Sequence, residues 1–182
     1  CTSRQGKEFD TMKNTALMRE LQTIEESVVL DGELYIHNGT FEHLGVLRKK
    51  HVLESDKELL DMIEYHVYDI IDTEKPFQER IQQLRDFIAK HPFQKIKFVE
   101  TVEISSEKDI QPQHTLFIND NYEGSILRNK NGKYKCKYRS PDLLKYKDFE
   151  DAEYTILDFS FEKDTTGEDS PLIVWVCSTE DG

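Results

Sequence analysis

The chain has 182 residues, with 24 Lys and Arg against 36 Asp and Glu, so its formal net charge is -12 at pH 7. This length suits one domain, or one domain with part of a second, and no apolar run approaches the roughly 20 residues that span a bilayer. The three cysteines are widely spaced and contain no C-x-x-C pair, which excludes an obvious disulfide framework or zinc site. These features predict an intracellular protein without a membrane segment.

The first elements of the chain are a predicted helix and a predicted hairpin. Leucine and isoleucine at helical spacing predict a helix over Thr11–Glu26, with Asp10 as its N-cap. The apolar segment Val28–His37 is typical of a β-strand, and Asn38-Gly39 is a hairpin turn signal. We therefore expect a hairpin that turns at these two residues.

The middle of the chain predicts two further helices and several strands. Ser55-x-x-Glu58 resembles a capping box that opens a short helix, after which Tyr65–Ile71 is a predicted strand. Pro76 suits the first turn of a helix that continues to Lys90. Strands are then expected over two segments, Lys95–Ile104 and Tyr122–Arg128.

The last part of the chain predicts another hairpin and a change of pattern. Asn131-Gly132 is a strong hairpin signal, and it predicts a paired strand over Lys133–Tyr138. From Asp151 onward, the pattern is a strand, a polar loop at Lys163–Ser170 and a second strand. We therefore expect an α+β fold with antiparallel sheets and flanking helices over residues 1–149, followed by an all-β module over residues 150–182.

The charge pattern reverses locally between residues 123 and 147. Glu123 precedes a dense basic segment that is interrupted by one acid, Asp142. The basic residues of this segment are Arg128, Lys130, Lys133, Lys135, Lys137, Arg139, Lys145 and Lys147. Like charges repel unless an anion lies among them, so this segment predicts a phosphate-bearing ligand.

Five short motifs occur in order along the chain. They are Ser3-Arg4 with Gly6, Asp31-Gly-Glu-Leu-Tyr35, Val67-Tyr-Asp69, Glu123-Gly-Ser-Ile-Leu-Arg128 and Leu143-Leu-Lys-Tyr-Lys147. This series resembles motifs Ia, III, IIIa, IV and V of the ATP-dependent DNA ligases, which are covalent nucleotidyltransferases, and it is most similar to the small viral and phage enzymes. The resemblance implies a nucleotidyltransferase (adenylation) domain over residues 1–149 that lacks its N-terminal portion, and the beginning of an OB-fold β-barrel over residues 150–182.

The resemblance also implies an activity. A ligase lysine attacks the α-phosphate of ATP and forms lysyl-AMP; AMP then moves to the 5′-phosphate of a nick in duplex DNA, and the adjacent 3′-hydroxyl displaces it. The implied cofactors are ATP and Mg²⁺, the implied partner is nicked duplex DNA, and a monomer is expected. Such an enzyme would act in DNA repair or replication, in the cytoplasm, the nucleus or a viral factory.

The resemblance assigns roles to individual residues. As catalytic residues, Lys145 and Lys147 would meet the α-phosphate, and Glu33 would meet the ribose or assist at the metal. Glu123 would hold Mg²⁺, because hard cations prefer carboxylate oxygen. Tyr68 would stack on adenine and Arg4 would contact a nucleotide or DNA phosphate, while for Asp69 we expect a structural hydrogen-bonding role. Further DNA contacts are expected from Lys133, Lys135, Lys137 and Arg139.

Two motifs of the family do not occur in the chain. The nucleophilic lysine of the family lies in K-x-D-G, which is absent here, and so is the closing motif VI. Lys7 and Lys13 do not replace that lysine, because neither precedes Asp-Gly. We therefore expect a fragment that does not form lysyl-AMP alone. The alternatives are an RNA ligase, an mRNA capping guanylyltransferase, or a non-catalytic relative that binds nucleic acid.

Overall fold

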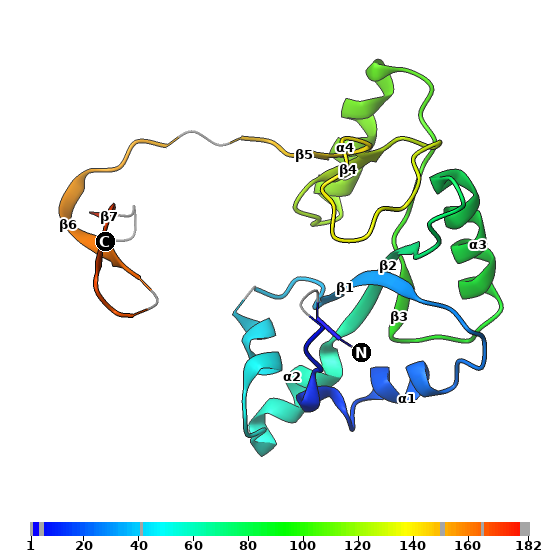
Figure 1. The fold of residues 1–182 in the computed structure, drawn as a ribbon, viewed down its shortest axis with the longest axis horizontal. Coiled ribbons are helices and arrows are strands. Elements are labelled where there is room, and N and C mark those ends of the chain that lie inside the picture. Colours follow the sequence, from blue (N-terminus) through cyan, green and yellow to red (C-terminus); the bar gives the residue numbers. More distant parts are fainter. Residues whose placement is uncertain (1, 4–5, 41, 150–151, 165, 179–182) are drawn as a thin grey trace. The chain divides into compact units, whose positions relative to one another are not determined.

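The computed structural model describes residues 2–3, 6–40, 42–149, 152–164 and 166–178 (Figure 1). It divides into two compact units, residues 1–147 and residues 148–182. Unit 1 contains the helices α1 (Ala16–Gln22), α2 (Lys57–Met62), α3 (Phe77–Ala89) and α4 (Ile110–Asn119), and the strands β1 (Leu30–Tyr35), β2 (Glu64–Ile70), β3 (Ile96–Phe98), β4 (Ser125–Arg128) and β5 (Leu143–Tyr146). Short 3₁₀ helices are η1 (Asp10–Met12), η2 (His43–Arg48), η3 (Glu54–Asp56) and η4 (Glu107–Asp109).

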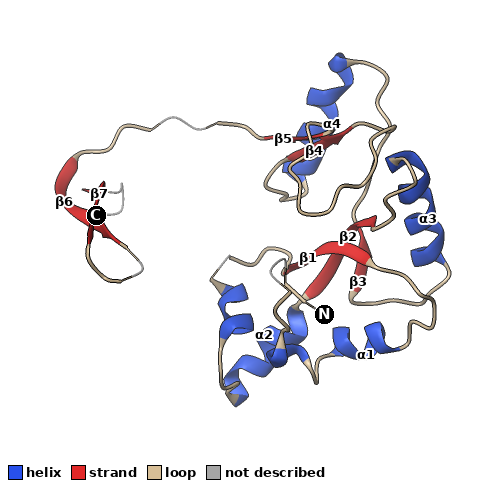
Figure 2. Ribbon diagram, in the orientation of Figure 1, coloured by secondary structure: helices blue, strands red, loops and turns tan. Residues whose placement is uncertain are grey.

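A three-stranded sheet and helix α3 form the centre of unit 1 (Figure 2). Strand β2 pairs antiparallel with β1 and parallel with β3. Helix α3 packs on β2 and β3 and buries one apolar face, whose members recur at helical spacing: Phe77, Ile81, Leu84 and Phe87. Pro76 precedes its first turn, where the missing N–H costs nothing, so the helix begins where the sequence predicts it.

The hairpin predicted at Asn38-Gly39 is wrong. Asn38 does adopt a left-handed turn conformation, with φ of 59°. The chain then continues into η2, whose apolar side chains Leu44, Val46 and Leu47 pack against the core. Strand β1 is left free to pair with β2, so a partner distant in sequence replaces the local one.

Two predicted helix starts are also wrong. The Thr15 hydroxyl, and not Asp10, accepts a hydrogen bond from the Met18 N–H and caps α1, which is shorter than expected. The Asp56 carboxylate accepts from the Leu53 N–H at 2.9 Å, so Ser55 does not supply the cap before α2. Side chains of this kind compete for the same backbone donors, and spacing alone does not decide between neighbours.

A second, two-stranded sheet of unit 1 consists of β4 and β5. The pair is antiparallel, with Arg128 opposite Leu143 and Ile126 opposite Lys145. The predicted strand over Lys133–Tyr138 does not form, because the partner of β4 is β5 and the basic residues between them form a long loop. The strand predicted over Lys95–Ile104 is limited to β3, and the sequence did not predict helix α4.

Unit 2 contains one antiparallel hairpin, β6 (Ile156–Lys163) and β7 (Asp169–Cys177). Both strands fall where the alternating pattern predicts them, on either side of the polar loop. Among the described residues, no helix is long and apolar enough to cross a membrane.

Candidate functional site

A groove of about 1820 Å³ is lined by basic side chains from separate parts of unit 1. The loop between β4 and β5 contributes four of the residues predicted to bind DNA: Lys133, Lys135, Lys137 and Arg139. A second set, which the sequence did not predict, comes from the N-terminal segment, the last residue of η2 and the two residues after it: Lys7, Arg48, Lys49 and Lys50. Among the described residues that line the groove, ten Lys and Arg side chains stand against six Asp and Glu, an excess that favours an anionic polymer as its occupant.

The basic loop is anchored at its beginning. The Gly132 carbonyl accepts a hydrogen bond from the Phe77 N–H at 2.9 Å, and the Lys130 carbonyl accepts from the Gln78 N–H at 2.9 Å. The N–H groups that open a helix have no partner within it, so the first turn of α3 holds the loop. The later loop residues Lys135, Lys137 and Arg139 are exposed, and Lys137 has a positive φ of 54°.

Tyr68 lies on β2 at the same groove. Its ring is partly buried, and Asp31 and Glu33 of β1 are among the charges that act on it. Burial, followed by the nearby Asp31 carboxylate, raises the pKa of Tyr68 to about 12. The phenol is therefore neutral at physiological pH, and the ring can offer an uncharged face to a base.

Gly32 allows β1 to present Asp31 and Glu33 beside Tyr68. Asp31 pairs with Asp69 and Gly32 pairs with Val67, so Tyr68 is the extra residue of a β-bulge on β2. A Cβ at Gly32 would lie 2.5 Å from the His66 carbonyl oxygen, so no other residue fits this approach. Asp31 and Gly32 therefore lie opposite a bulge at Tyr68, and bulges redirect side chains next to functional sites.

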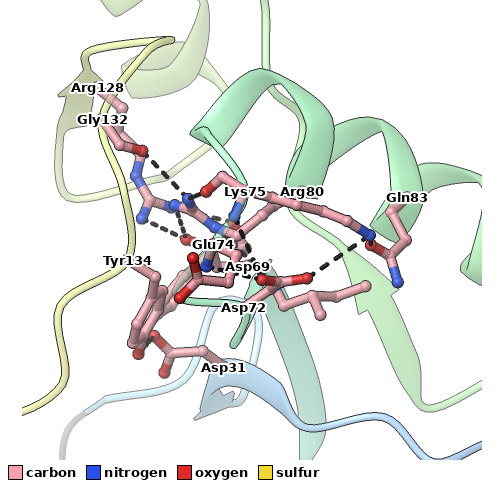
Figure 3. Close-up of polar contacts among 12 residues, drawn as sticks. Asp31, Asp69, Asp72, Glu74, Lys75, Arg80, Gln83, Arg128, Gly132 and Tyr134 are labelled. Atoms are coloured by element: carbon pink, nitrogen blue, oxygen red, sulfur yellow. Dashed lines mark hydrogen bonds and ion pairs between the residues drawn. The ribbon is translucent and has the colours of Figure 1, made fainter.

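Asp69 forms a buried hub directly after Tyr68 (Figure 3). Its Oδ1 accepts from Arg80 Nε at 2.8 Å, and its Oδ2 accepts from Arg80 Nη2 at 3.0 Å and from Arg128 Nη2 at 2.6 Å. Arg80 Nη1 also donates to the carbonyls of Lys75 and Gly132, at 2.7 and 3.1 Å. The structural role predicted for Asp69 is confirmed: its carboxylate joins β2, α3 and β4.

Three residues predicted to be catalytic or metal-binding meet at the second sheet. Lys145 and Lys147 both form ion pairs with Glu123, the first at 3.7 Å. A Cβ at Gly124 would lie 2.7 Å from the Tyr146 carbonyl oxygen, so this glycine lets the chain pass close to β5. None of Glu123, Lys145 and Lys147 lines the 1820 Å³ groove, whereas Tyr68 and Glu33 do.

Side chains of helix α4 contact the residues next to Glu123, Lys145 and Lys147. His114 is buried, its Nδ1 lies 2.9 Å from Ser125 Oγ, and its ring meets the Tyr146 ring edge to face at 4.7 Å. The Tyr146 hydroxyl donates to Gln111 Oε1 at 2.7 Å. Ser125 is two residues from Glu123, and Tyr146 lies between the two lysines. By contacting Ser125 and Tyr146, α4 therefore helps to position all three charged side chains.

The carboxylates fit a magnesium ion only in part. Within the described residues, no group of three His, Cys, Asp or Glu side chains could hold a metal. Glu123 is exposed, and Mg²⁺ commonly uses one or two carboxylates together with water and substrate phosphates. The donor set thus fits an ion that arrives with a phosphate-bearing substrate. The remaining predicted site residue, Arg4, lies outside the described residues.

The chain is similar to several known DNA ligases. A DNA ligase of African swine fever virus (isolate Pig/Kenya/KEN-50/1950) is 33% identical over 186 residues, which covers 96% of this chain and 42% of the viral protein. The chain thus spans less than half the length of that relative. A solved Lig E DNA ligase structure superposes with a TM-score of 0.73 at 21% identity, over 100% of this chain and 67% of that one. The structure of Chlorella virus DNA ligase-adenylate gives a TM-score of 0.63 at 25% identity, over 91% of this chain and 61% of that one.

A family model described as the ATP dependent DNA ligase domain matches residues 1–147. That match spans the two sheets of unit 1, the basic loop and every element that contributes to the groove. The chain therefore belongs to the ATP-dependent DNA ligase family.

Proposed function

We propose that this chain is the nucleotide-binding and nick-binding part of a ligase that seals 5′-phosphate/3′-hydroxyl nicks in duplex DNA. The observation that carries the proposal is the meeting of Lys145 and Lys147 at one exposed carboxylate, Glu123. Two lysines beside a carboxylate that is proposed to bind Mg²⁺ suit the binding of a phosphate during its transfer, because phosphoryl transfer rests on positioning and on charge stabilisation.

The proposal gives each part of the site a role. Tyr68 stacks on the adenine, and Glu33 meets the ribose. Lys145 and Lys147 bind the phosphate that is transferred. The cations of the groove hold the DNA backbone, from Lys133, Lys135, Lys137 and Arg139 on the basic loop.

The sealing step then has a defined course. The 3′-hydroxyl oxygen attacks the 5′-phosphorus of an adenylated nick, and the phosphorus–oxygen bond to AMP breaks. AMP leaves with the bonding electrons, and the hydroxyl proton passes to solvent. This step needs no K-x-D-G lysine, which residues 1–182 do not contain.

Mg²⁺ would be held by Glu123, with Glu33 as a second candidate oxygen donor. A bound Mg²⁺ neutralises charge that develops on the transferring phosphate. Before substrate binds, the two lysines occupy the Glu123 carboxylate, and their ion pairs must open to release it.

Unit 2, the oligomeric state and the cellular location are part of the same proposal. The hairpin β6–β7 provides the first strands of an OB-fold that begins at about residue 150, which agrees with the division of the chain after residue 147. A monomer inside the cell, in the cytoplasm, nucleus or viral factory, would meet both ATP and nicked DNA.

The binding of three labelled DNA duplexes by the 182-residue chain tests the proposal. One duplex is intact, one has a 5′-phosphate nick, and one has a nick already joined to AMP through a pyrophosphate link. Fluorescence anisotropy should show the highest affinity for the adenylated nick and the lowest for intact DNA, because only the adenylated nick reaches both Tyr68 and the basic loop. Equal affinities for all three would refute the proposal, and preference for a nicked RNA duplex would favour the RNA ligase alternative.

A further inference from the structure

One hydrogen bond joins the basic loop to the strand beside the predicted nucleotide site. The Tyr134 hydroxyl donates to Asp31 Oδ2 at 2.7 Å, across a sequence separation of 103 residues (Figure 3). Burial, and then this hydrogen bond, raise the pKa of the Tyr134 hydroxyl, so the phenol keeps its proton and remains a donor at neutral pH. A hydrogen bond from a neutral hydroxyl to a carboxylate is stronger than one between two neutral groups.

Each partner belongs to a different functional region. Asp31 precedes Gly32 and Glu33 on β1, opposite the bulge at Tyr68 of β2, and it pairs with Asp69. Tyr134 lies between Lys133 and Lys135 on the basic loop. The bond therefore connects the backbone that presents Glu33 to the backbone that presents the loop cations.

A second contact supports the same connection. The Arg80 guanidinium lies over the Tyr134 ring at 5.5 Å and donates to the Gly132 carbonyl, two residues earlier in the loop. Arg80 is itself fixed by Asp69, the neighbour of Tyr68. The Tyr134 side chain is thus held by Arg80, which contacts its ring, and by Asp31, which accepts from its hydroxyl.

We propose that the Tyr134–Asp31 hydrogen bond makes Tyr134 a positioning residue that couples nucleotide binding to nicked-DNA binding. This inference rests on the proposed function, because it requires both ligands to bind. A nucleotide against Tyr68 and Glu33 restricts the strand at Asp31, and Asp31 in turn restricts Tyr134 and the loop. DNA that binds next loses less loop freedom, so the two ligands favour each other.

The test compares the affinity of the 182-residue chain for a nicked duplex without AMP and with saturating AMP. The unchanged chain should bind the nick at least about fivefold more tightly when AMP is present, which lies within the usual range of coupling between sites. Tyr134→Phe removes only the hydroxyl, and it should reduce this ratio to about one. Its affinity for AMP alone should stay within about twofold of the unchanged chain, because Tyr134 lies outside the proposed base-binding contact.

Tyr138→Phe is the matched control, because Tyr138 is an exposed tyrosine of the same loop. This variant should keep the full ratio. The reciprocal measurement, AMP affinity with and without nicked DNA, must give the same factor in each protein, since coupling between two binding sites is symmetric.

Three results overturn the inference while leaving the proposed function intact: both ligands bind without coupling, Tyr134→Phe keeps the full ratio, or Tyr138→Phe loses the ratio equally. Failure of the unchanged chain to bind either AMP or nicked DNA would instead remove the proposed function, and this inference with it.

Discussion

Arg80 binds Asp69 through two hydrogen bonds, at 2.8 Å from Nε and 3.0 Å from Nη2, with side-chain exposures of 2% and 0%. Breaking a buried ion pair on one side leaves an uncompensated charge, which is far more costly than the pair is favourable. Asp69 also holds Arg128, so its removal would leave two arginines without their shared partner.

Asp69→Asn should lower the free energy of unfolding by about 3–5 kcal/mol, the usual consequence of breaking a buried pair. Urea denaturation followed by circular dichroism measures the change. Asp86→Asn is the control, because Asp86 is exposed on the same helix as Arg80, and its effect should stay within about 0.5 kcal/mol. Equal losses in the two variants would show that the hub contributes nothing particular to stability.

Tyr68 provides a test of the proposed base pocket. Tyr68→Ala should weaken AMP binding by about 1–3 kcal/mol, the usual contribution of stacking between a base and an aromatic ring. Tyr68→Phe keeps the ring and should bind AMP nearly as well as the unchanged chain, as isothermal titration calorimetry would show. If both variants lose the same affinity, the hydroxyl is the important group and stacking is not the mode of binding.

The strong local signals in the sequence predicted β2 and α3 closely. Both have regular apolar periodicity, and Pro76 marks the start of α3. The site residues were harder to predict from the sequence, because Arg80 and Tyr134 form their contacts with residues far away in the chain. One signal could have identified Arg80: it lies among the apolar positions Phe77, Ile81 and Leu84, where a charged side chain requires a buried counter-charge.

The errors in strand pairing share one physical cause. Asn131-Gly132 and Asn38-Gly39 are correct turn signals, but a turn does not determine that the following segment becomes a strand. Strand β1 pairs with β2, and β4 pairs with β5; no local sequence pattern indicates these partners. Helix α4 lacks a clear apolar stripe, and its one buried residue is His114, which binds Ser125.

The exposed cations of the basic loop should contribute to DNA affinity through phosphate contacts. Lys135→Ala should reduce the slope of log K against log salt concentration by about 0.9, and a triple variant with Lys137→Ala and Arg139→Ala should reduce it about three times as much. The losses should be alike for unrelated DNA sequences. Lys57→Ala is the control, because Lys57 pairs with Glu54 and does not line the groove. An unchanged slope in the triple variant would show that the DNA lies elsewhere.

The central claim is that Glu123, Lys145 and Lys147 form the centre of phosphodiester synthesis. Sealing of a pre-adenylated nick by the 182-residue chain with Mg²⁺ tests it most directly, because this step is independent of the K-x-D-G lysine. The account predicts joined DNA with release of AMP, and a rate at least about 100-fold lower for Glu123→Ala, comparable to the loss of one transition-state contact. Glu107→Ala, which replaces an exposed carboxylate of η4, should seal normally. Absence of sealing by the unchanged chain, or equal sealing by Glu123→Ala, would contradict the account.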